Sequence, residues 1–218
     1  MQLVRLWQQV EEINKKHFPD NTLVPIVGNG KTTKPKFMFV FINPTKKNIS
    51  ADRNWQGPRF PFIGTKQVWR IFHRAGLFDD ALMAHIEKKA WTPAFTDTVL
   101  EFLKAQEFYF TNIVKWTGHD ATLPDAKKIE LFLPLLKEEI KLVQPQYIVT
   151  FGLIPFERLT DTKIKLGEYY TTAVAQQKLT PYPLAVNGVQ TQVIPCYFPI
   201  GRGDPKKAVV LLQLLQKF

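Results

Sequence analysis

The clearest indication of fold in this 218-residue chain is FMFVFINP, residues 37–44. Its first six residues form the longest wholly apolar run in the sequence, and Asn43-Pro44 ends that run. A short run that is apolar at every position predicts a strand buried on both faces of a sheet. Because such a sheet must be covered on both sides, this stretch predicts an α/β protein.

Three more segments have the same character, and helical patterns separate them. The further strands are expected at Phe108–Val114, Tyr147–Phe151 and Gln190–Tyr197. Apolar spacing and capping residues predict helices at residues 3–16, 65–75, 79–89, 96–105 and 124–143, after Gly152, and from 204 to about 217. We therefore expect a single three-layer α/β domain over residues 1–218, with a mostly parallel four-stranded central sheet and helices on both faces. Residues 1–36 are expected to form a helix and a loop packed on it.

Composition excludes several classes of protein. The only cysteine, Cys196, excludes a disulfide framework, a cysteine-rich zinc site and a cluster held by four thiolates, and its place in a strand predicts a buried, inert thiol. The four histidines are isolated, and the sequence has no phosphate-binding GxxxxGK[ST] loop, no GxGxxG after a strand and no GxSxG elbow. No apolar run is long enough for a membrane span. We expect an intracellular, cytoplasmic protein, associated with the nucleoid if it is bacterial, that needs no metal and no cofactor.

Positive charge is concentrated around this stretch, residues 37–44. The chain has 29 Lys and Arg against 19 Asp and Glu, a formal net charge of +10. Residues 31–74 contain ten basic residues and one acidic residue, Asp52. A basic block inside a folded domain indicates a polyanionic partner, with nucleic acid first. The alternative is a solvated lysine-rich surface.

Polar or aromatic residues follow the expected strands at Asn43, Asn112 and Phe198. In open α/β sheets, ligands bind outside the carboxyl ends of the strands. An asparagine amide can pair with the edge of a nucleobase or hold a water, aromatic rings can stack on bases, and basic residues can meet phosphates. The residues alone therefore favour a nucleic-acid-directed α/β domain. Asn43 can equally begin a turn, and Asn112 can cap a bend.

Five segments, in order, resemble the uracil-DNA glycosylase superfamily. Residues 37–44 resemble its first motif, in the Asn-Pro form of the mismatch-specific and single-strand-selective branches. Two segments resemble the iron–sulfur branch. FPFIG at residues 60–64, followed by a helix that ends before Gly76, resembles its PFVG segment. FTNIVK at residues 110–115 resembles its TNVVK segment. QPQYIVTFG at residues 144–152 resembles the family's strand with the pattern P..iv.lG. PCYFP at residues 195–199 lies where the family has TYHP.

The resemblance implies a DNA repair enzyme that flips a damaged base out of DNA and hydrolyses its bond to the sugar. Asn43 would be the catalytic residue and hold the attacking water. Phe62 would stack on the base unless it is plain core, Asn112 would read the base edge, and Phe198 would complete the base site. We expect the protein to be a monomer with DNA as its partner. The DNA would contact Lys46, Lys47, Arg59, Lys66, Lys115, Ile200 and Arg202.

Two departures from the family pattern leave three hypotheses open. The iron–sulfur branch needs four cysteines and this chain has one, so no cluster is expected. Phe198 stands where the family has a histidine that stabilises the departing base, and loss of one such donor typically costs ~10²–10³ in rate. The first hypothesis is a glycosylase for a deaminated base (uracil or similar). The second is a glycosylase-fold DNA-binding protein with weak or no activity. The third is an unrelated α/β enzyme that acts on a small anion.

Overall fold

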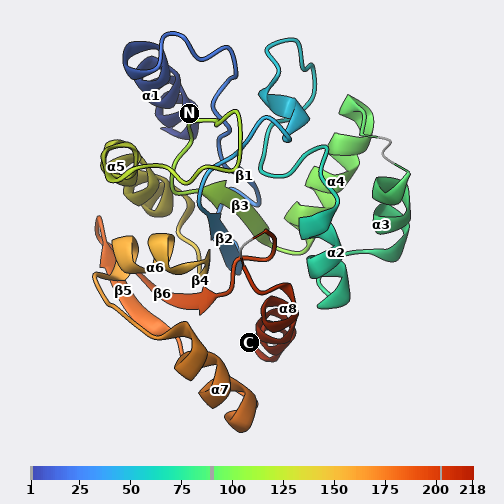
Figure 1. Ribbon diagram of the computed structural model, residues 1–218, viewed down its shortest axis with the longest axis vertical. Helices are drawn as coiled ribbons and strands as arrows, with labels where there is room; N and C mark the ends of the chain where they lie inside the picture. Colours follow the sequence, from blue (N-terminus) through green and yellow to red (C-terminus); the bar gives the residue numbers. More distant parts are fainter. Residues whose placement is uncertain (1, 89–90, 202) are drawn as a thin grey trace.

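The computed structural model describes residues 2–88, 91–201 and 203–218. Within these ranges the strands form one six-stranded sheet in the order β1-β3-β2-β4-β6-β5, at the centre of the molecule (Figure 1). The strands are β1 Asn29–Gly30, β2 Phe37–Phe41, β3 Phe108–Asn112, β4 Tyr147–Phe151, β5 Tyr182–Val186 and β6 Val189–Cys196. The stretch that predicted the fold is therefore β2, which is buried at all five positions.

The four expected strands are the parallel centre of the sheet, as predicted. β2 pairs in parallel with β3 and β4, and β4 pairs in parallel with β6. The count of four is corrected to six, because the short strand β1 and strand β5 add antiparallel edges. β5 and β6 form a hairpin around Asn187-Gly188, both at positive φ. Asn-Gly is a strong hairpin signal that the sequence analysis did not use.

Eight α-helices lie in the described ranges: α1 Gln2–His17, α2 Gln67–Arg74, α3 Asp80–Glu87, α4 Pro93–Ala105, α5 Ala126–Val143, α6 Leu153–Thr160, α7 Leu166–Gln176 and α8 Pro205–Leu214. Side chains of Asp79, Thr92, Asp125 and Asp204 accept the capping bonds at the starts of α3, α4, α5 and α8. α7 was not expected, because it buries only Ala173 and so carries little apolar periodicity. No described helix is long and apolar enough to cross a membrane.

Helices cover both faces of the sheet, which gives the predicted three layers. α1, α5 and α6 pack on one face, and α2, α3, α4 and α8 pack on the other (Figure 1). Alternate residues of the four parallel strands enter opposite cores, because side chains alternate across a strand. Phe37, Phe39 and Phe41 of β2 face the α2 side, and Met38 and Val40 face the α5 side.

Candidate functional site

The carboxyl ends of the four parallel strands bring the predicted site residues to one edge of the sheet. Asn112 ends β3, Asn43 follows β2, Gly152 follows β4 and Phe198 follows β6. Backbone hydrogen bonds continue the pairing at this edge, from the Ile113 amide to Phe41 (2.8 Å) and from the Gly152 amide to Cys196 (2.9 Å). The sheet therefore arranges the four tips in the order Asn112, Asn43, Gly152, Phe198.

Asn112 has a buried side chain whose polar atoms lack a hydrogen-bond partner in the described part of the chain. Its exposed fraction is 1%, and neither Nδ2 nor Oδ1 has a partner among the described residues. Strand alternation places its side chain on the face of Phe108 and Phe110, the aromatic side of the sheet. A buried unsatisfied amide costs about 1–3 kcal/mol, so native proteins rarely keep one without a use. Asn112 has the donors and the acceptor that a base edge requires.

Phe62 is held in a strained conformation beside β2. Its φ of 74° lies in the left-handed region, which is rare for a bulky residue. Three donors secure its carbonyl: the Thr65 amide at 3.1 Å, the Thr65 hydroxyl at 2.9 Å and Trp69 Nε1 at 3.1 Å. Its half-buried ring meets the Phe41 ring edge-on, with centroids 4.6 Å apart. Phe41 is the register partner of Asn112, so Phe62 and Asn112 are both neighbours of this residue.

Asn43 is half-buried, and its amide is only partly used. Nδ2 donates to the backbone carbonyl of Pro44 at 3.1 Å. That bond fixes the side chain next to the strand tip and leaves Oδ1 as an acceptor with no protein donor in the described part of the chain. Such an oxygen can accept a hydrogen bond from a water at the sheet edge.

The segment after β6 turns sharply beside Gly152. Phe198 and Ile200 are both half-buried and pack against the aromatic core. A Cβ on Gly203 would lie 1.8 Å from the Phe198 carbonyl oxygen, so only glycine permits this close approach. A Cβ on Gly152 would lie 4.0 Å from that of Phe198, which puts the two tips next to each other. Arg202, also predicted as a DNA contact, lies outside the described residues.

The basic block of residues 31–74 is divided by the fold. Lys31, Lys34 and Lys36 lie at the amino ends of β2 and β3, opposite the site, where the amides of Lys31 and Lys34 bond to Phe108 and Val143. Lys46 and Lys47 follow Asn43 at the site edge and are exposed. Of this group, these two lysines are the ones best placed to meet a polyanion at the strand tips.

Arg59 and Lys66, both predicted DNA contacts, are engaged in the protein. Arg59 donates to the carbonyls of Ser50 (2.9 Å), Asp52 (3.2 Å) and Trp55 (3.2 Å), and so holds the loop that follows β2. Lys66 pairs with Glu87 at 3.4 Å. The pKa of Glu87 is lowered to about 2, chiefly by its hydrogen bond from Arg70, so the carboxylate stays charged and offsets Lys66.

The prediction that Lys115 contacts DNA is not supported by its position in the structure. Its side chain is fully buried on the α5 side of the sheet, where it pairs with Glu139 of α5 and also donates to Thr111 and to the carbonyl of Asn112. It cannot reach a phosphate. Glu139 was not predicted from the sequence, although a signal was present: it lies three residues after Leu136 and four before Val143, on the buried face of α5.

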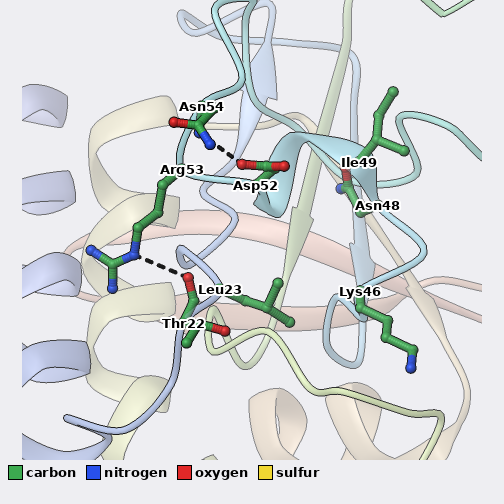
Figure 2. A pocket seen from close by; sticks show the side chains of 8 residues that line it. All are labelled: Thr22, Leu23, Lys46, Asn48, Ile49, Asp52, Arg53 and Asn54. Atoms are coloured by element: carbon green, nitrogen blue, oxygen red, sulfur yellow. Dashed lines mark hydrogen bonds between the residues drawn. The ribbon is translucent and has the colours of Figure 1, made fainter.

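An open pocket of about 470 Å³ lies beside the site, between the loop before β1 and the loop after β2 (Figure 2). It is lined by Thr22, Leu23, Lys46, Asn48, Ile49, Asp52, Arg53 and Asn54. Arg53 crosses one side and donates to the Thr22 carbonyl at 3.0 Å (Figure 2). The lining residues do not include Asn112, whose amide is covered. Residues 2–88, 91–201 and 203–218 contain no group of three His, Cys, Asp or Glu that could hold a metal ion.

The chain matches the model of a known protein family. The family model described as the Uracil DNA glycosylase superfamily matches residues 27–211 of the 218-residue chain. The match begins before β1 and ends in α8, so it includes every strand tip described above. No curated protein matches the chain significantly.

Proposed function

Because the chain belongs to the uracil-DNA glycosylase superfamily, we propose that it hydrolyses the bond between a deaminated base and its deoxyribose in DNA, as a base excision repair enzyme. The observation that carries the proposal is the Asn112 amide, buried at a strand tip with both polar atoms unpartnered. A base that enters the site would pair with this amide and recover the hydrogen bonds that it lacks. A base with the wrong edge would leave donors or acceptors unpaired.

Asn43 supplies the water in this proposal. In the reaction the glycosidic C–N bond breaks, its electron pair leaves with the base, and a water oxygen bonds to the sugar carbon. Asn43 Oδ1 is free of protein donors in the described structure and would orient that water. An amide cannot remove a proton as a carboxylate does, so its contribution is placement of the water. The water proton ends on the departing base.

The leaving base receives little help from Phe198. Negative charge develops on the base as the bond breaks, and a donor aimed at this charge would lower the barrier. Phe198 has no donor, and Asn112 is then the described donor best placed to meet the base. We therefore propose a slower enzyme than family members that carry a histidine at this position.

The proposal requires the site to open. The Asn112 amide is covered, so a base reaches it only after neighbouring side chains move. Phe62 and Phe198 are half-buried next to the same strand tips and are the side chains we propose to move. Phe62 would then stack on the extruded base, as aromatic side chains do with unstacked bases. Lys46 and Lys47 would contact the DNA phosphates. We propose that the protein acts inside the cell and as a monomer.

A second function is favoured by one observation, the phenylalanine at position 198. A protein that lacks the donor for the leaving base can keep the fold and bind DNA without cutting it. Membership of the superfamily removes the third hypothesis, an unrelated α/β enzyme that acts on a small anion. The two remaining functions differ in whether a free base is produced.

The experiment is an assay of free base release from oligonucleotides that carry one uracil, hypoxanthine or xanthine, in single-stranded and duplex form. We expect release of at least one of these bases by the parent protein and loss of release in Asn43→Ala, with DNA binding retained. A parent protein that binds the oligonucleotides but releases no base would replace the first function with the second. Activity should survive a chelator, since the proposed mechanism uses no metal.

A further inference from the structure

We propose that Lys115, together with Glu139, is a positioning residue that holds Asn112 in the orientation needed to read a base. This inference rests on the proposed function, because it assigns a task to a cluster behind the same amide. Lys115 and Glu139 lie on the opposite face of the sheet from the Asn112 side chain, and Lys115 contacts Asn112 only at its backbone carbonyl.

The hydrogen bonds of the cluster converge on the end of β3. A lysine ammonium has three donors, and Lys115 directs them to Glu139 Oε2, Thr111 Oγ1 and, at 2.6 Å, the backbone carbonyl of Asn112. Glu139 Oε1 also accepts from the Tyr109 hydroxyl and from Thr111, each at 2.9 Å. Three residues of β3, Tyr109, Thr111 and Asn112, are thus tied to α5 through one ion pair.

The need for such a clamp follows from the state of Asn112 itself. Within the described residues, its side chain has no hydrogen-bond partner that would fix its direction. Its orientation therefore depends on packing and on its backbone, and Lys115 holds the backbone carbonyl. Displacement of a site residue by about 1 Å can cost ~10²-fold in rate, so a rigid backbone at this position has direct value for base reading.

The cluster is also closed to water. Lys115 and Glu139 both have exposed fractions of 0%. A Cβ on Gly28 would lie 2.2 Å from Glu139 Oε1 and 2.6 Å from the Tyr109 hydroxyl, so the N-terminal loop seals the cluster at a position that only glycine can occupy. Burial lowers the pKa of Lys115, and the Glu139 carboxylate opposes this effect.

Stability alone does not account for this arrangement. Desolvation of two charges offsets most of their attraction, and replacement of a buried ion pair by uncharged groups of similar volume is often neutral or stabilising. Removal of one partner is strongly destabilising, because the other charge is then left uncompensated. A test must therefore remove both charges together.

The test compares the parent with Lys115→Met/Glu139→Gln. We expect an unchanged melting temperature and DNA affinity, and a fall of roughly 10²-fold in the rate of base release at saturating DNA. The second measurement needs no activity: in ¹⁵N-labelled protein, the side-chain NH₂ signals of Asn112, identified by their absence from Asn112→Leu, should shift or broaden. The matched control is Lys141→Met/Glu138→Gln, a solvent-accessible pair on the same helix, which should change neither the rate nor these signals.

A third variant separates positioning from folding. Tyr109→Phe removes one hydrogen bond to Glu139 and keeps both the ion pair and the bond from Lys115 to Asn112, so the Asn112 signals and the rate should stay close to those of the parent. Unchanged signals in the double variant would overturn the inference, and so would their loss in Tyr109→Phe. A parent protein without base release would refute the proposed function, and the NH₂ signals would then decide the positioning role alone.

Discussion

The ring of Phe62 meets the ring of Phe41 edge-on, with centroids 4.6 Å apart, although Phe62 has a φ of 74°. Phe41 stacks in turn on Phe151 at 4.4 Å, and its register partner in β3 is Asn112. A loop residue is thus held in an unfavourable conformation against the strand tip that carries the unpartnered amide. Strain of this kind persists only where the surroundings enforce it, and it is concentrated at functional sites.

Asn112→Leu should make the protein more stable and less active. The substitution removes an amide that is buried without partners, so the free energy of unfolding should rise by about 1–3 kcal/mol, while base release is lost. Denaturant unfolding and the base release assay measure the two effects. Asn48→Leu is the matched control, because Asn48 is 3% exposed and its amide bonds to Phe60 and Ser50. That control should lower stability; a loss of stability in Asn112→Leu as well would show that the Asn112 amide is structural.

Phe62→Gly should be more stable than Phe62→Ala by about 1 kcal/mol, because a left-handed conformation costs a non-glycine residue about 1–2 kcal/mol. Both variants should lose base release if the ring stacks on the base. The comparison is with Phe60→Ala, since Phe60 is fully buried and its loss should cost about 3–5 kcal/mol. A stability loss of that size in Phe62→Gly would instead assign Phe62 to the core.

Charge reversal at Lys46 and Lys47 should weaken DNA binding and reduce its salt dependence, by about one unit of slope for each phosphate that the variant no longer neutralises. Arg59 is left out of this test because it holds the loop. Lys31→Glu/Lys34→Glu makes the same change in charge at the opposite edge of the sheet and should have a much smaller effect. Equal effects of the two double variants in a salt titration would mean that only net charge matters.

Phe198→His should raise the rate of base release. The imidazole restores a donor near the departing base, and a donor of this kind is worth up to ~10²–10³ in rate. Single-turnover kinetics on the best substrate measure the gain. Tyr197→His, one residue earlier in the same segment, is the control and should give no gain. If Phe198→His shows no gain on any substrate, the position does not face the leaving base.

The sequence predicted the parts of the fold that depend on continuous apolar runs. β2, β3 and β4 are buried at all but one residue and β6 over its last four, and such runs have few alternative structures. α7 and β5 were missed because α7 buries one residue and β5 alternates at an edge. These elements depend on neighbours that no local pattern specifies.

The positions of the candidate site residues were harder to predict than the fold, and those of the basic residues were the hardest. Asn43, Asn112 and Phe198 lie along one edge because the carboxyl ends of parallel strands point the same way. A count of basic residues did not show that Lys31 and Lys34 lie at the far edge or that Lys115 is buried against Glu139. Which charged residues are paired depends on contacts between segments that are distant in the sequence. Lys115 and Glu139, for example, are 24 positions apart.

Whether this protein is a glycosylase that reads its base through Asn112 is tested by the rate of uracil, hypoxanthine or xanthine release under single-turnover conditions, in the parent and in Asn112→Leu. We expect the parent to release at least one of these bases. We also expect Asn112→Leu, although folded and able to bind DNA, to release that base about 10²-fold more slowly or not at all. Release by Asn112→Leu at the rate of the parent, or no release by the parent from any of the three substrates, would contradict these expectations.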